Sequence, residues 1–367
     1  MCSRIPTPLL CVTIPLMAVI LVGCSASHVA EQVIRSDRYA FSEAIARSWD
    51  EQLLLNLVRL RYRDNPLFLE MGSIVTTYSV SGAAGVGGTI NLGGDTKVAL
   101  TPSLGVAMAA IPTMTYAPLQ GEEFAVRFLS PITPATILLL SQSGWSLERL
   151  FVLCVQRANG VSNATSASGP TPDIAPEFSR FHRLTEALRA LQRKELLDVH
   201  PDSAGRTVSL RIREPRGVHE DSAAATVRSI LDLDSSARSF AVTGSPERNR
   251  TDEIAVTGRS LLSVMFFLSQ AVEVPEADVH AGKVTVTRRE DGTAFDWSEV
   301  TGRVLHIHCS ESEPADAAIS VAFRGHWFSI DDSDLNSKST FNLLNYLFNL
   351  KAATKGNHEP LLTYPVR

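Results

Sequence analysis

The chain has 367 residues, of which 44% are hydrophobic and 20% charged, and its net charge is −5 at pH 7. This balance is typical of a folded protein and argues against large-scale disorder. A mildly acidic chain without basic clusters also argues against a nucleic-acid-binding protein.

The first 23 residues have the three-part layout of a secretory signal peptide. Arg4 lies in a short first region, an apolar run follows from Leu9 to Val22, and small residues precede Cys24. That run is shorter than the roughly 20 apolar residues that a membrane-spanning helix needs, and no later segment reaches that length. We therefore expect the leader to be removed, which leaves a mature chain of net charge −6 without a transmembrane helix.

Leu21-Val22-Gly23-Cys24 closes this leader. The four residues resemble the lipobox of bacterial lipoproteins. The resemblance implies that the Cys24 thiol receives a diacylglyceryl group and that its amine receives a third acyl chain, such as palmitate. Two or more chains hold a protein stably on a membrane. Because Ser25 and not Asp follows, the resemblance favours the periplasmic face of the outer membrane. An ordinary signal peptide cut near Ala26 is the alternative.

Residues 24–41 are interpreted as a lipidated N-terminus and linker, and a helix is predicted from about Ser42. Apolar residues recur along one face of this helix at spacings of three and four, which predicts packing into a core or against a partner. They are Ile45, Trp49, Leu53, Leu57 and Leu60. Arg59, Arg61 and Arg63 near its end are compatible with lipid phosphates or with an ordinary solvated helix end.

From Met71 to Pro118 the only charged residues are Asp95 and Lys97. The β-branched, small and Gly residues on either side predict two to four antiparallel strands. Three interpretations stay open: a sheet covered by the protein's own helices, a mobile Gly-rich loop, and a hairpin that joins those of other copies to line a membrane pore. Tyr78, Tyr116 and a polar row fit the third, but the alternation breaks down from Gly82 to Gly88. The polar row is Ser73, Thr77, Ser79 and Ser81.

The rest of the chain predicts helices first and then a mixture of helices and strands. The expected helices are Glu122–Leu129, one from Pro134, Trp145–Val155, Phe178–Leu197, Ala223–Leu233, Arg259–Val272 and Thr340–Leu350. The expected strands are Thr207–Ile212, Lys283–Thr287, Arg303–Cys309, Ala317–Phe323 and His326–Ile330.

The predicted fold class is therefore α+β, with an N-terminal apolar helix and Gly-rich antiparallel strands before a mixed C-terminal half. The expected parts are the signal peptide 1–23, the linker 24–41, a segment 42–160, an internal linker 161–176 rich in small residues, and a C-terminal part 177–367.

Local motifs for chemistry are weak. His306 and His308 would share a strand face, with His326 and Asp331 as further ligands, but half-exposed strand histidines are the commoner pattern. The acids Asp331, Asp332 and Asp334 are compatible with calcium or with a helix-opening turn.

Two further groups of residues have both an ordinary and a functional interpretation. Phe295, Trp297, Trp327 and Phe328 are compatible with core filling or with a ligand groove. Cys154 and Cys309 stay in the mature chain, and export permits a bridge between them. The sequence contains no P-loop, nucleophile elbow or HExxH motif, so it indicates no catalytic residue, cofactor or metal.

Four segments resemble an uncharacterised family of bacterial envelope lipoproteins, and this resemblance implies no activity. They are Glu51–Tyr62, Pro112–Glu122, Gly258–Leu262 and Arg324–Asp332. The leading hypothesis is a membrane-anchored lipoprotein, not an enzyme, with a periplasmic interaction or assembly role through a protein partner or self-association. The first alternative is an oligomeric outer-membrane pore or transport component built from hairpins of residues 71–118. The second is an envelope hydrolase with a non-local active site.

Overall fold

The computed structural model describes residues 39–90, 98–170, 172–201, 208–213, 222–245 and 250–352. Its fold is α+β. The chain divides into two compact units, one formed by residues 67–126 and the other by the residues on both sides of them. Cys24 and the predicted signal peptide lie outside the described residues. Among the described helices, none is long and apolar enough to cross a membrane.

In the larger unit, residues 39–61 form an N-terminal helix that packs against α10 (Leu335–Ala352). Trp49 contacts Phe348 edge-on at 5.1 Å between ring centroids, and its Nε1 donates to Asn345 Oδ1 at 3.0 Å. The apolar face of this helix is fully buried at Leu54 and Leu57. Burial of side chains of this size contributes about 1.5–3 kcal/mol each, so this face stabilises the larger unit.

Two of the three arginines at the end of this helix, Arg61 and Arg63, form hydrogen bonds within the protein. Arg61 Nη1 donates to Gln270 Oε1 at 3.3 Å and to the Thr285 carbonyl oxygen at 3.2 Å, and Arg63 donates to Thr285 Oγ1. Burial lowers the pKa of Arg61 to about 10. These contacts favour a structural role for both side chains over the binding of lipid phosphates.

The larger unit contains a six-stranded sheet with the strand order β4-β3-β8-β7-β6-β5. All neighbours are antiparallel except β7 and β8, which are parallel. The strands are β3 (Val155–Ala158), β4 (Val161–Ser162), β5 (Leu197–Pro201), β6 (Val208–Ile212), β7 (Ser239–Thr243) and β8 (Glu253–Gly258).

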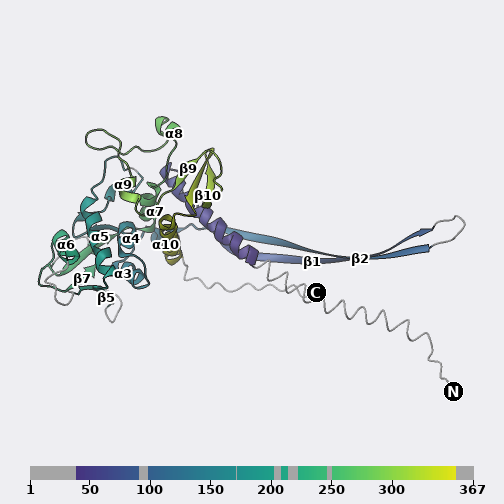
Figure 1. Ribbon diagram of the computed structural model, residues 1–367, viewed down its shortest axis with the longest axis horizontal. Helices are drawn as coiled ribbons and strands as arrows, with labels where there is room; N and C mark the ends of the chain where they lie inside the picture. Colours follow the sequence, from purple (N-terminus) through teal and green to yellow (C-terminus); the bar gives the residue numbers. More distant parts are fainter. Residues whose placement is uncertain are drawn as a thin grey trace, which may run out of the picture. The chain divides into compact units, whose positions relative to one another are not determined.

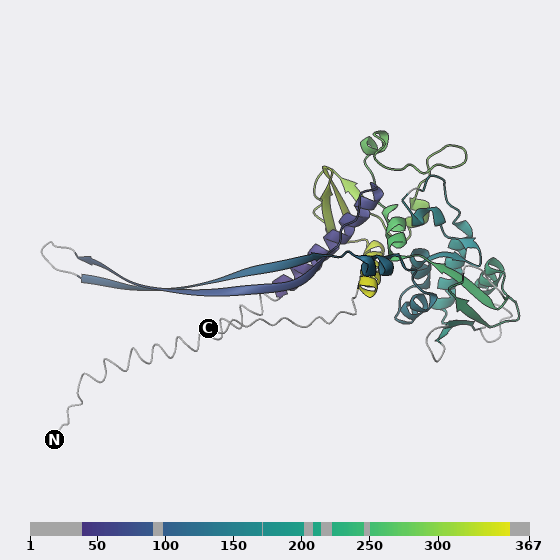
Figure 2. The same cartoon turned by 180° about the vertical axis from the view of Figure 1, so that it is seen from behind.

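Four helices accompany this sheet (Figures 1 and 2). They are α3 (Pro134–Gln142), α4 (Leu147–Cys154), α5 (Ser179–Arg193) and α6 (Ser222–Leu231). Thr133 and Ser146 cap α3 and α4 by accepting hydrogen bonds from Thr136 N and Arg149 N, which is why these helices begin where they do. Helix α3 packs on β5, β6 and β7, and α5 packs between α4 and α6.

A second, three-stranded sheet has the order β10-β11-β9. Its strands are β9 (His308–Ser310), β10 (Ala317–Phe323) and β11 (His326–Asp331), and the helices α7 (Leu261–Ser269), α8 (Glu276–His280) and α9 (Ser298–Thr301) precede them. Phe328 of β11 is fully buried and lies edge-on to Tyr62 at 6.4 Å between ring centroids. Tyr62 Oη in turn donates to Asp278 Oδ2 at 2.8 Å, and Lys283 Nζ lies 2.5 Å from Asp278 Oδ1.

Arg259, just before α7, is fully buried and joins α7 to the end of α4. Its Nη1 donates to the carbonyl oxygens of Val152, Leu153 and Val155 at 2.7, 3.1 and 3.1 Å. Its guanidinium carbon lies 4.2 Å from the centroid of the Phe267 ring. Burial lowers the pKa of Arg259 to about 9. The guanidinium therefore caps carbonyls at the C-terminal end of α4, and it shares those of Val152 and Val155 with the side chain of Asn163.

The structure differs from the predicted elements in several places. The predicted strand Arg303–Cys309 forms only from His308, as β9, and strands β3, β5, β7 and β8 were not predicted. Residues 161–176, predicted to be a linker, contain β4 and a 3₁₀ turn (Thr165–Ser168), and Asn163 within them is buried and donates to the Val155 carbonyl oxygen at 2.6 Å. The predicted strand Lys283–Thr287 does not form. In this segment the Thr285 carbonyl oxygen accepts a hydrogen bond from the Arg61 side chain and not from a neighbouring strand.

Candidate functional site in the β1–β2 hairpin

The smaller unit is dominated by one antiparallel hairpin, β1 (Leu69–Ile90) and β2 (Val98–Pro118). Figures 1 and 2 show it as a single twisted ribbon, two strands wide along its length. Its base is closed by a hydrogen bond from Leu119 N to the Phe68 carbonyl oxygen at 2.9 Å and by contact between the Phe68 and Phe124 rings. Strand β1 runs without interruption through Gly82–Gly88, so the interpretation of this region as a Gly-rich loop is wrong.

The register assigns an apolar set of residues to one face of the hairpin. Antiparallel partners share a face, and residues two apart on a strand lie on the same face. From Ile74 opposite Met114 to Ile90 opposite Val98, this face carries the even-numbered residues of both strands. We call it the apolar face. Its β1 residues are Ile74, Thr76, Tyr78, Val80, Gly82, Ala84, Val86, Gly88 and Ile90, and its β2 residues are Val98, Leu100, Pro102, Leu104, Val106, Met108, Ala110, Pro112 and Met114.

The opposite face carries small residues, many of which have a hydroxyl group. We call it the hydroxyl face. Its β1 residues are Ser73, Val75, Thr77, Ser79, Ser81, Ala83, Gly85, Gly87 and Thr89, and its β2 residues are Ala99, Thr101, Ser103, Gly105, Ala107, Ala109, Ile111, Thr113 and Thr115. The polar row predicted from the sequence lies entirely on this face, and Tyr78 lies on the apolar face. No charged residue is placed on either face between these limits.

The pairing explains why the alternation was lost in the sequence. Gly82, Ala84, Val86 and Gly88 have little side chain, but their partners on β2 are Val106, Leu104, Pro102 and Leu100. In this section of the apolar face, β2 therefore contributes most of the apolar side chains, and β1 contributes mainly small residues. A reading of β2 alone would have found the pattern, because each even-numbered residue from Val98 to Tyr116 is apolar or aromatic.

The hairpin forms a sheet of two strands, so each strand has an outer edge without a partner strand among the described residues. Such edges expose backbone N–H and C=O groups that readily pair with another strand. An isolated two-stranded hairpin is marginally stable in water. Pro102 and Pro112 each remove one donor from β2. A ribbon with an uncharged apolar face and two open edges is thus suited to a membrane or to further strands.

The strands are also longer than a bilayer requires. At about 3.3 Å per residue, 22 and 21 residues extend for roughly 70 Å. The ten steps from Val80 to Ile90 cover about 33 Å, which becomes about 25 Å along the membrane normal at a strand tilt of roughly 40°. This equals the height of the apolar band typical of membrane-spanning strands.

The residues that the sequence singled out for metal binding are not brought together. His308 lies in β9 with its Nδ1 3.1 Å from Glu273 Oε1. His306 precedes the strand and donates its backbone N–H to Ser337 Oγ at 2.8 Å. In the described part of the chain, no three His, Cys, Asp or Glu side chains are arranged to hold a metal ion.

The acidic turn is a helix opening. Asp331 Oδ1 accepts from Ser333 N at 2.7 Å, and Asp334 Oδ1 accepts from Ser337 N at 3.0 Å at the start of α10. Hydrogen bonds from Ser333 lower the pKa of Asp331. Asp332 pairs with Lys338 at 2.5 Å. These carboxylates are therefore occupied by the backbone and by a lysine.

The aromatic residues mainly fill the core, and the two cysteines are free. Phe295 and Trp297 are buried and contact each other at 5.2 Å between ring centroids, and Trp297 Nε1 donates to Thr287 Oγ1 at 2.9 Å. Phe328 is fully buried and Trp327 half-buried. Cys154 in α4 and Cys309 in β9 form no disulfide. Burial raises the pKa of the Cys154 thiol to about 12 and also raises the pKa of Cys309, which Glu273 raises further, so neither is an activated nucleophile.

Comparison with known proteins shows no relative: no family model, curated protein or solved structure matches the chain.

Proposed function

We propose that the protein is a lipid-anchored component of the bacterial envelope whose β1–β2 hairpin combines with the hairpins of other copies to form a membrane pore. One observation carries the proposal. The register separates the hairpin residues into an apolar face and a hydroxyl face over more than the length of strand that crosses a bilayer. Apolar residues would meet lipid, while Ser, Thr and Gly would line the aqueous side.

The open edges supply the second argument. In a bilayer every backbone polar group must find a partner within protein, so a lone hairpin cannot remain there with two unpaired edges. If the β1 edge of one copy pairs with the β2 edge of the next, identical hairpins close into a ring. Self-association, expected from the sequence, then becomes a requirement of the hairpin rather than an added property.

The expected lipid anchor at Cys24 supports the same proposal. Acylation would hold each copy at the membrane surface and would raise the local concentration at which hairpins meet. The larger unit would stay in the periplasm as the predicted interaction body. A lumen formed by the hydroxyl face would carry no fixed charge within the paired region, so we expect weak discrimination between small cations and anions.

An interaction role without a pore is the second candidate, and the open edges favour it. A partner sheet could accept the hairpin as added strands, with main-chain hydrogen bonds providing affinity. This candidate predicts a monomeric or partner-bound protein without conductance.

Oligomeric state and conductance of the full chain distinguish the two. The purified protein in detergent should form rings of several copies by native mass spectrometry, and planar bilayers should show discrete conductance steps. The control variant replaces residues 71–118 with a short Gly-Ser linker, and circular dichroism checks that the larger unit is folded. We expect it to be monomeric and silent. A wild-type protein that is monomeric in all detergents and never conducts would refute the pore.

A further inference from the structure

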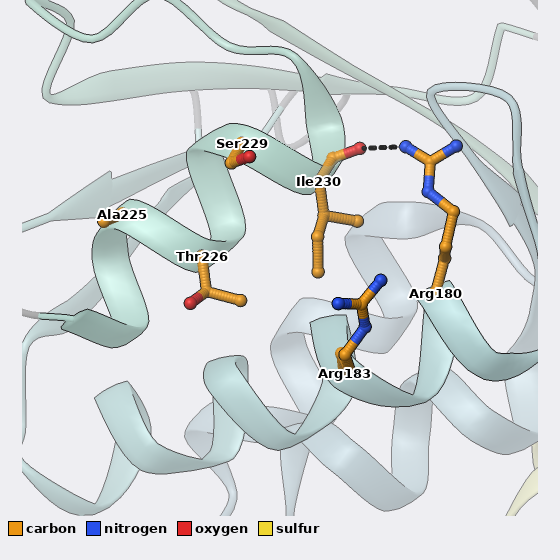
Figure 3. A pocket seen from close by; sticks show the side chains of 6 residues that line it. All are labelled: Arg180, Arg183, Ala225, Thr226, Ser229 and Ile230. Carbon is orange, nitrogen blue, oxygen red and sulfur yellow. Dashed lines mark hydrogen bonds between the residues drawn. The ribbon is translucent and has the colours of Figure 1, made fainter.

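A shallow pocket of about 420 Å³ lies between α5 and α6 in the larger unit (Figure 3). Its lining consists of Arg180 and Arg183 from α5 and of Ala225, Thr226, Ser229 and Ile230 from α6. None of these residues is acidic. Figure 3 shows both arginine side chains reaching from α5 toward α6. The pocket is therefore lined by two guanidinium groups and by no carboxylate.

The two arginines differ in their hydrogen bonds to the rest of the protein. Arg180 Nη2 donates to the Ile230 carbonyl oxygen at 3.3 Å and thereby caps the last turn of α6, which leaves its remaining N–H groups available. Arg183 forms no hydrogen bond or ion pair with the described residues, and it is exposed. The nearby Glu186 on α5 is engaged by Arg303. The positive charge of Arg183 is therefore not neutralised within this part of the protein.

Other donors at the pocket suit an anion. Ser229 is exposed and its hydroxyl is free to donate, whereas Thr226 Oγ1 already donates to the Ser222 carbonyl oxygen at 2.8 Å. Arg180 lies in the first turn of α5, where the helix dipole favours negative charge, whereas Ser229 and Ile230 lie in the last turn of α6, where the dipole favours positive charge. Guanidinium groups bind the oxygens of phosphate through paired N–H donors.

We propose that the Arg180–Arg183 pocket binds a phosphate group carried by a phosphomonoester. The site is independent of the hairpin and of the pore. A phosphomonoester carries about −1.5 to −2 charges at pH 7, which matches two guanidinium groups. The same chemistry is offered by a soluble phosphomonoester and by the headgroup of a phosphate-ended lipid, and the experiment separates these sources.

Equilibrium dialysis of the full chain in detergent against labelled inorganic phosphate tests the site. We expect saturable binding, and Arg183→Gln should weaken it at least tenfold because it removes the uncommitted guanidinium. Arg183→Lys should retain part of the affinity, since the charge stays but the paired donors are lost. Arg47→Gln is the matched control: Arg47 is a helix arginine whose side chain is 77% exposed, and its loss should leave binding unchanged.

Competition identifies the source of the phosphate. Displacement of the label by micellar phosphatidic acid at a concentration at least tenfold lower than that of glycerol phosphate supports a lipid headgroup. Equal potency supports a soluble ligand. The proposal is overturned if the wild-type protein shows no saturable binding, if Arg183→Gln binds as well as wild type, or if Arg47→Gln weakens binding equally. Unchanged thermal unfolding of each variant excludes a loss of fold as the cause.

Discussion

The two faces of the hairpin can be tested with one substitution made at two adjacent positions. Leu104 pairs with Ala84 on the apolar face, and Ser103 pairs with Gly85 on the hydroxyl face. Their β1 partners both lie within the section from Val80 to Ile90 that would cross the bilayer. Leu104→Lys and Ser103→Lys add the same charge one residue apart, so differences between them report the face and not the charge.

The expected magnitude follows from the cost of a lysine facing lipid. At the bilayer midplane this cost is about 2–4 kcal/mol, which lowers an insertion equilibrium by roughly 30- to several hundred-fold per copy. Because every copy in a ring carries the substitution, Leu104→Lys should abolish pore formation. A lysine on an aqueous lumen has no such cost and should instead make the pore prefer anions.

Dye release from vesicles and reversal potentials in planar bilayers measure both effects. We expect no release and no conductance from Leu104→Lys, and near-normal release with a shift of reversal potential toward chloride from Ser103→Lys. Circular dichroism should show equal helix content in both variants. Equal loss of activity in both, or a larger loss from Ser103→Lys, would refute the assignment of the faces.

Two further predictions concern the larger unit. Arg259→Met should leave the Leu153 carbonyl oxygen without its arginine donor, whereas the Val152 and Val155 carbonyls keep the hydrogen bonds that Asn163 donates. At about 1–3 kcal/mol for one unsatisfied buried group, we expect a loss of about 1–3 kcal/mol in the free energy of unfolding, and urea unfolding that shows no loss would contradict this. Two hydrogen bonds lower the pKa of Asp278, of which that from Lys283 has the larger effect and that from Tyr62 the smaller. The ionised carboxylate therefore stabilises the folded protein above the pKa of about 4 that Asp has in an unfolded chain. This stabilisation is lost as the pH falls through the lower pKa of Asp278 in the folded protein. Lys283→Met should therefore unfold more easily at pH 7, while its stability approaches that of wild type toward pH 2; a constant difference across this range in denaturant titrations would show that Asp278 is not the cause.

Local signals in the sequence were sufficient for many elements of the fold. Acidic residues in a first turn indicated α2 (Glu122–Leu129), and Pro134 indicated the start of α3. The structure has these helices, and α4, close to the predicted bounds. The apolar run from Leu150 to Val155 is buried. Such features depend on residues a few positions apart, which is the range over which capping and helical periodicity act.

Features that depend on distant pairing were missed. Strand β8 is a short apolar run whose partner β3 lies about 100 residues earlier in the chain, and nothing near Glu253–Gly258 indicates that partner. Arg259 looks like a surface residue because its acceptors are backbone carbonyls of α4, which have no sequence signature. The glycines of β1 hid the apolar face, since only the register shows which residues of β2 lie opposite them.

The central claim is that the hairpin places its two faces in different environments within a membrane. Single cysteines at positions 103–108, each labelled with an environment-sensitive fluorophore in a Cys309→Ser background, test this directly. With vesicles present, labels at Leu104, Val106 and Met108 should shift to the blue and be quenched by lipid-borne nitroxides. Labels at Ser103, Gly105 and Ala107 should instead be quenched by aqueous iodide. The same response at all six positions, or a blue shift that needs no vesicles, would contradict the account.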